Sequence, residues 1–249
     1  MDSKKDESGQ QESSGAFNQT NIAGIDIASF KAPTTLTKWL KALLVIGIIL
    51  AAAAVYSGWR QYLFLNAVKN SAYSSEEQLN ADAQANDLRQ SIIGLSQVAI
   101  FITTLVFFFI WVHRANYNAR KLGVQNMKFT PGWSVGWYFI PIANLWKPYQ
   151  AMKEVWNGSN AFNKSGGFIL GLWWLLWIVS GMFSKASFRL SLRAKELDEL
   201  ISSTSVTITS DFVDVLSGIA TLILISSIFA MQMSHLRRLQ TDTIDTLRP

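Results

Sequence analysis

The sequence predicts an all-α integral membrane protein. Of its 249 residues, 49% are apolar and 16% are charged, whereas about 25% of the residues in an average globular protein are charged. The apolar residues gather in four windows without Asp, Glu, Lys or Arg, at 42–59, 90–113, 165–184 and 215–235. About 20 helical residues span the roughly 30 Å hydrocarbon core of a bilayer. Buried helices of soluble proteins seldom run this long without polar residues, so we expect about four transmembrane helices.

The chain begins with a polar segment, residues 1–35, that we expect to be disordered. It is rich in Ser, Gln, Asn and charged side chains, a composition that cannot bury enough apolar surface to offset the entropy lost on ordering. A secretory signal peptide starts with a short basic region, so we expect the first window to be an uncleaved signal anchor. The first helix is predicted at 37–58, with Trp39 and Trp59 near its ends, where aromatic residues meet lipid headgroups.

Three more spans are predicted, at 91–112, 167–184 and 212–233. The polar connection before the second span contains a short helix at 75–90, capped by Ser74 or Ser75. Asp211 and Asp214 precede the fourth span, where acidic groups suit the positive end of the helix dipole. Residues 36–236 therefore form a transmembrane helical domain, followed by a short cytoplasmic tail at 237–249.

The basic residues indicate the orientation of these spans. With four spans, the N-terminal region up to Lys41, the 113–164 connection and the C-terminal tail share one side and carry fifteen Lys and Arg, against seven on the other side. The positive-inside rule then places both termini in the cytoplasm, at the cell (inner) membrane. Because the basic residues flank the windows, the net charge of +5 indicates lipid headgroups rather than nucleic acid as the partner. A second copy of the chain or another membrane protein is a further expected partner.

A fifth window without charged residues, 129–146, contains two prolines and four Trp or Tyr side chains. Pro141 removes an amide donor and clashes with the preceding helical turn, and Trp and Tyr prefer the headgroup level. We therefore expect an interfacial or re-entrant, half-depth element over 129–157 rather than a span. A crossing would place the two termini on opposite sides, and the sequence leaves that alternative open.

A short amphipathic helix is expected at 148–157, with Pro148 at its first position. Tyr149, Met152 and Trp156 recur at helical spacing along one side, and the charged residues lie elsewhere on the helix. This pattern is typical of a helix that lies flat on the membrane surface.

Residues in and after the fifth window form a motif with the core Pro-x-x-Asn-Leu-Trp-x-Pro. Its members are Pro131, Trp133, Trp137, Pro141, Asn144, Trp146, Pro148, Glu154 and Trp156. The motif resembles a bacterial membrane family catalogued as domain of unknown function 4328, and the resemblance covers roughly residues 40–235. It implies a multi-spanning bacterial membrane protein and brings no activity or catalytic residues with it.

The motif has two interpretations. In the first, the prolines and Asn144 fix a turn that the tryptophans anchor at the interface. In the second, the broken element lines a polar pocket, as in transporters with discontinuous helices. Asn144 is the nearest side chain that offers both a donor and an acceptor to the freed carbonyls. Glu154 is expected to pair with Lys147, Lys153 or Arg114.

No catalytic, cofactor-binding or metal-ligating set is predicted. The chain has no cysteine, which excludes disulfides, thiolate metal sites and Cys nucleophiles. His113 and His235 fall at helix ends beside arginines, so we expect them to face lipid headgroups. They would form a metal pair only if their helices adjoined.

Three classes of function remain. The first is a non-catalytic scaffold or accessory membrane component, because the predicted spans lack the ionisable residues that ion and proton pathways usually need. The second is a small transporter or channel, in which the Pro141/Asn144 break and neutral polar residues such as Gln97 and Ser180 line a path. The third, a membrane-embedded enzyme, would need a nucleophile or a metal.

Overall fold

The computed structural model describes residues 21–22, 25–26, 29–124, 126–159 and 167–246. Most of the segment expected to be disordered, 1–35, and the chain end 247–249 lie outside these residues. Two short strands, β1 (Asn21–Ile22) and β2 (Ile25–Asp26), form an antiparallel pair. Every other element among the described residues is helical.

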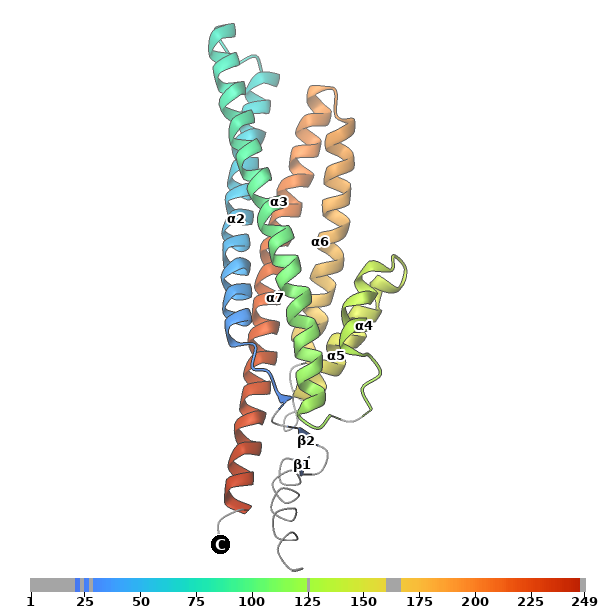
Figure 1. Cartoon of the computed structure of the whole chain (residues 1–249). Helices are drawn as coiled ribbons and strands as arrows, with labels where there is room; N and C mark the ends of the chain where they lie inside the picture. The colour runs from blue at the N-terminus through green and yellow to red at the C-terminus, as the bar shows by residue number, and fades with distance from the viewer. Residues whose placement is uncertain (1–20, 23–24, 27–28, 125, 160–166, 247–249) are drawn as a thin grey trace, which may run out of the picture. The chain divides into compact units, whose positions relative to one another are not determined.

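Four long helices dominate the described chain (Figure 1). They are α2 (Thr34–Lys69), α3 (Glu76–Lys121), α6 (Gly167–Arg193) and α7 (Leu197–Thr246). All four are long and apolar enough to cross a membrane. The predicted fold class, an all-α membrane protein with four spanning helices, is confirmed.

The helices extend well beyond the predicted spans. The polar helix at 75–90 exists, and Ser75 Oγ accepts the Gln78 N–H at 3.2 Å, but it continues without a break into the second span as α3. Likewise α7 begins at Leu197, so the prediction that Asp211 and Asp214 precede this helix is wrong.

The Ser/Thr-rich stretch before Asp211 can remain helical because its hydroxyls bond back along the helix. Ser205 Oγ donates to Ile201 O at 3.0 Å, and Thr207 Oγ1 donates to Ser203 O at 2.9 Å. This local pairing satisfies the polar side chains without ending the helix.

Contacts divide the chain into two compact units. Unit 1 comprises residues 1–34, 109–165 and 226–249, and unit 2 comprises 35–108 and 166–225. Helices α3 and α7 contribute to both units. Unit 1 contains the three regions that a four-span topology places on one side of the membrane, together with the adjoining ends of the second and fourth predicted spans.

Close helix packing in unit 2 depends on small residues. A Cβ atom on Gly58 would lie 2.7 Å from Ile208 Cγ1, and one on Gly218 would lie 2.7 Å from Ile48 Cγ1. Beside these contacts, Trp173 is 1% exposed and packs against Phe108, with ring centroids 6.5 Å apart. This core holds the four helices of unit 2 together through dispersion contacts, as is usual within a bilayer.

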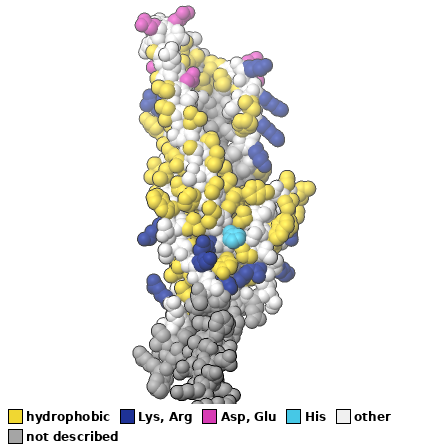
Figure 2. Space-filling view, in the orientation of Figure 1, with side chains coloured by type: hydrophobic (Ala, Val, Ile, Leu, Met, Phe, Trp, Pro, Cys, Tyr) yellow, Lys and Arg dark blue, Asp and Glu magenta, His cyan; other side chains and the backbone are white. Residues whose placement is uncertain are grey.

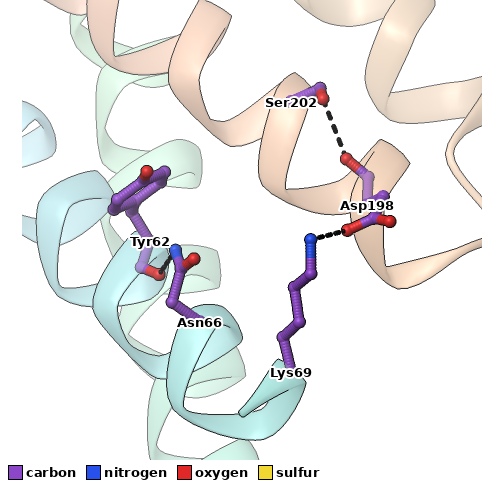
Figure 3. Close-up of polar contacts among 5 residues, drawn as sticks. All are labelled: Tyr62, Asn66, Lys69, Asp198 and Ser202. Atoms are coloured by element: carbon purple, nitrogen blue, oxygen red, sulfur yellow. Dashed lines mark hydrogen bonds and ion pairs between the residues drawn. The ribbon is translucent and has the colours of Figure 1, made fainter.

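An ion pair joins α2 to the start of α7 within unit 2. Figure 3 shows Lys69 Nζ and Asp198 Oδ1, which lie 2.6 Å apart. Ser202 Oγ donates to the main-chain oxygen of Asp198 at 2.8 Å, one turn along α7. Both charged side chains are at least half exposed, at 50% and 71%, so solvent screens their attraction.

Unit 1 contains the broken element. Its pieces are α4 (Pro131–Gly136), the 3-10 turns η2 (Trp137–Phe139) and η3 (Ala143–Leu145), and α5 (Lys147–Ser159). At about 1.5 Å of rise per residue, α4 is only about 9 Å long. No piece between 129 and 146 approaches the length of a span, so the prediction of a Pro-broken element is confirmed.

The amphipathic helix is present as α5, but its apolar side is not free to meet lipid. Met152 is 1% exposed and Trp156 is 6% exposed, because α4, η2 and η3 pack against α5. The expectation that this apolar side meets lipid at the membrane surface is therefore wrong. Other parts of unit 1 cover the face that was assigned to lipid.

Candidate functional site

Three motif residues meet at an open pocket of about 560 Å³ in unit 1. Its lining consists of Lys128, Phe129, Trp133, Trp137, Lys147, Gln150, Lys153, Glu154 and Asn157. Of the predicted motif, Trp133, Trp137 and Glu154 take part. The other members build the surrounding elements: Pro131 starts α4, and the buried Pro148 and Trp156 belong to α5.

One wall of the pocket, the segment 127–129, is held at both edges. From α3, Arg120 Nη2 donates to Met127 O at 3.0 Å and to Phe129 O at 2.8 Å. Asn116 Nδ2 donates to the same Phe129 oxygen at 3.1 Å. From α5, the Glu154 carboxylate accepts the N–H groups of Lys128 and Phe129, each at 3.1 Å. These charge-assisted bonds place Lys128 and Phe129 at the pocket.

Glu154 therefore does not have the role expected of it. The sequence predicted an ion pair with Lys147, Lys153 or Arg114, but main-chain amides occupy both carboxylate oxygens. Sequence reasoning also missed Asn116 and Arg120. The available signal was their spacing of four residues beside the charge-free window, which puts an amide and a guanidinium on one helix face.

The aromatic wall is built by α4 and η2. Thr130 caps α4 by accepting the Trp133 N–H at 3.3 Å, and Pro131 occupies the first turn. The Trp133 and Trp137 rings lie 4.9 Å apart, and a Cβ atom on Gly136 would approach the Trp133 ring to 3.1 Å. Glycine at this position lets the two indoles lie against each other, tilted by 36°, at the pocket edge.

A lysine faces two rings of the pocket. Lys147 Nζ lies 5.6 Å from the centroid of Phe129 and 5.6 Å from that of Trp137. Both contacts are within the range in which an aromatic face attracts a cation. They hold the ammonium group over the pocket.

The break itself lies apart from the pocket. The Asn144 N–H donates to Ile140 O at 2.7 Å, and Trp146 O accepts the Gln150 N–H at 3.1 Å. The Asn144 side chain was expected to supply both a donor and an acceptor at the break. Its Oδ1 is buried and accepts no hydrogen bond from the described residues, so the expected role as acceptor is wrong. Main-chain hydrogen bonds also join the Leu145 N–H to Ile142 O and the Trp146 N–H to Ala143 O, so the break is a folded corner. Neither Pro141 nor Asn144 lines the pocket.

Buried amides tie the remaining segments of unit 1 together. Gln232 Nε2, on α7, donates to Ala115 O at 2.9 Å and to Ser159 Oγ at 3.0 Å. Asn118 Nδ2 donates to Lys31 O at 3.0 Å, and Asn118 Oδ1 accepts the Lys31 N–H at 3.3 Å. These contacts join the N-terminal segment, α3, α5 and α7 around one interior.

Unit 2 contains a second set of polar contacts, within its helices. Asp211 Oδ1 accepts a hydrogen bond from Gln97 Nε2 at 3.2 Å, and Asp214 accepts one from the Ser180 hydroxyl. The sequence named Gln97 and Ser180 as polar span residues but missed their acidic partners, because it placed both aspartates before the helix.

The other groups considered from the sequence do not assemble into a reactive site. His113 is exposed and His235 is half-buried. Among the described residues, no three His, Cys, Asp or Glu side chains are grouped as a metal would require. Burial raises the pKa of the Tyr138 phenol above its ordinary value.

A family model described as a domain of unknown function, DUF4328, matches residues 74–230, more than half of the chain. The chain belongs to this family. The matched region contains all nine motif residues, the pocket and the polar contacts of Asp211 and Asp214, whereas α2 lies before it. No curated protein and no solved structure matches the chain.

Proposed function

We propose that this member of the DUF4328 family is a non-catalytic membrane scaffold or accessory component. In this proposal four spans anchor the chain, and unit 1 presents the pocket to a ligand or partner. The observation that carries the proposal is the apolar packing within unit 2, where Trp173, Leu224 and Ile225 are 1%, 0% and 0% exposed. Close-packed apolar side chains of this kind exclude water from the part of the unit that they fill.

The charge distribution supports cytoplasmic termini in a cell membrane. Fifteen of the 22 Lys and Arg lie on the terminal side of a four-span topology, and cytoplasmic segments carry such an excess. Unit 1, with its lysine-lined pocket, then faces the cytoplasmic leaflet. The bilayer is its first partner, and a second copy or another membrane protein is a further one.

Ion flux tests this proposal. The purified protein would be reconstituted into liposomes loaded with dyes for H⁺, K⁺ or Cl⁻, next to empty liposomes prepared in the same way. A scaffold leaves all three leak rates equal to those of empty liposomes. A leak that rises in proportion to the protein content would overturn the proposal.

One observation favours a second candidate, a small cation transporter. Asp211 and Asp214 are ionisable groups within a candidate span, and such residues commonly mark ion or proton pathways. This version places the path in unit 2, away from the Pro141/Asn144 break first considered. It predicts cation flux that Asp214→Asn reduces at least about tenfold and that Asp198→Asn, a change at the exposed helix start, leaves intact.

A further inference from the structure

We infer that the pocket of unit 1 binds the headgroup of an anionic phospholipid. The inference rests on the proposed function, since it names the ligand that the pocket would take. The charged residues of the pocket lining are mainly basic. Lys128, Lys147 and Lys153 line the pocket with a single carboxylate, Glu154. Each oxygen of that carboxylate accepts one main-chain N–H, and three lysines against one carboxylate leave the lining with a net charge of +2.

The lysines are arranged on different elements around one space. Lys128 belongs to the wall held by Arg120 and Glu154, whereas Lys147 and Lys153 lie on α5. The aromatic contacts of Lys147 fix its position without neutralising its charge. Lysines that line one space from two segments suit a phosphate, which presents several oxygens to several donors. Basic pockets on the cytoplasmic side of membrane proteins bind lipid headgroups in this way.

The neighbouring surface identifies the phosphate compound as a lipid. A row of apolar side chains between 133 and 146 is 38–71% exposed in unit 1, namely Trp133, Phe139, Ile140, Ile142, Leu145 and Trp146. Figure 2 shows hydrophobic side chains gathered over α4 and the segment after it, with basic side chains at their edge. Trp133 belongs both to this row and to the pocket lining. A ligand seated there meets cations at one end and an apolar surface at the other, which matches an amphiphile.

The volume agrees with this assignment. A pocket of about 560 Å³ falls in the range of small-molecule sites, roughly 300–1,000 Å³. It can hold a glycerophosphate headgroup, while the acyl chains remain outside along the apolar row. Inorganic phosphate or a sugar phosphate, which carries no apolar group, would gain nothing from that row.

Native mass spectrometry of the detergent-solubilised full-length protein tests the inference. The probes are phosphatidylglycerol, phosphatidylcholine with the same acyl chains, and inorganic phosphate as a competitor. We expect phosphatidylglycerol to bind at least about tenfold more tightly than phosphatidylcholine and to resist millimolar phosphate. Equal binding of the two lipids overturns the inference, and displacement by phosphate overturns the assignment to a lipid.

Charge-neutralising variants locate the site. The double variant Lys128→Gln/Lys147→Gln is expected to lose about tenfold or more in affinity, since each cation near an anionic lipid contributes roughly fivefold. The control, Lys185→Gln/Arg189→Gln, removes the same charge from exposed residues of α6 in unit 2. An equal loss in the control overturns the site. Lys153→Gln alters one exposed side chain and should leave the fold intact. Its affinity for phosphatidylglycerol is expected to fall a few-fold, and unchanged affinity contradicts the inference.

These lipid measurements are made in detergent, without a flux readout. Ion leak in liposomes would contradict the scaffold proposal without affecting the inference of a headgroup site. Absence of lipid preference would remove the headgroup site and leave the scaffold proposal standing.

Discussion

Single side chains determine the shape of the pocket in unit 1. The segment 127–129 has no regular secondary structure, and its main-chain groups bond instead to Arg120, Asn116 and Glu154. Buried polar groups of the main chain need such partners. The sequence identified Glu154 as important through the motif but assigned it the wrong partner, because composition cannot show that a carboxylate faces amides rather than ammonium groups.

Glu154→Gln is expected to loosen this wall. The amide offers one acceptor in place of two and turns an N–H₂ group toward a main-chain donor, which costs about 1–3 kcal/mol. Hydrogen exchange in detergent should show faster exchange of the Lys128 and Phe129 amides. The matched control is Glu199→Gln, because Glu199 also accepts two main-chain amides, from Lys195 at 2.8 Å and Glu196 at 3.3 Å. Unchanged exchange at 128–129 in Glu154→Gln would contradict this account of the wall.

Helix length is the feature that the sequence predicted least well among the elements. The four apolar windows gave the number and order of the spans, since a bilayer sets their minimum length. They could not give the helix ends, because helices α3 and α7 continue through polar residues once neighbouring helices are available to pack against. Asp211 and Asp214 are an example. They were predicted to precede the fourth helix, but they lie inside α7 and accept hydrogen bonds from side chains of α3 and α6.

Glycine positions test the packing of these elements. Gly218→Ala places a methyl group 2.7 Å from Ile48, and such overpacking typically costs about 1–3 kcal/mol. Gly171→Ala is the matched control, because nothing lies within 4 Å of its added Cβ and alanine favours a helix by about 1 kcal/mol. Thermal unfolding in detergent should show a lower midpoint for Gly218→Ala and an equal or higher one for Gly171→Ala. The reverse order would show that α2 and α7 do not pack as described.

The ion pair between α2 and α7 is expected to matter little. Lys69 and Asp198 are largely exposed, and exposed pairs contribute at most about 1 kcal/mol. Lys69→Ala should therefore shift the unfolding midpoint by only a degree or two, and less at high salt. A much larger loss would mean that this contact holds α2 and α7 together, contrary to the account given for unit 2.

At the scale of the whole molecule, the fold class and the number of spans followed from the sequence, whereas the functional site followed only in part. Trp133, Trp137 and Glu154 were predicted as motif members and do line the pocket. Lys128 was noticed only as a basic residue of the 113–164 connection, and Lys147 only as such a residue and a candidate partner of Glu154, since their approach to one space depends on the corner at Pro141. Periodicity and composition cannot predict a convergence produced by several short turns.

The four-span topology, with both termini on the same side of the membrane as the 113–164 connection, is the central claim of this account. The chain has no cysteine, so single cysteines at Ala72 and Asn157, both exposed, report their side of the membrane without background. An impermeant maleimide applied to right-side-out and inside-out vesicles should label Ala72→Cys from the outer face and Asn157→Cys from the cytoplasmic face. Labelling of both cysteines from the same face would contradict the account.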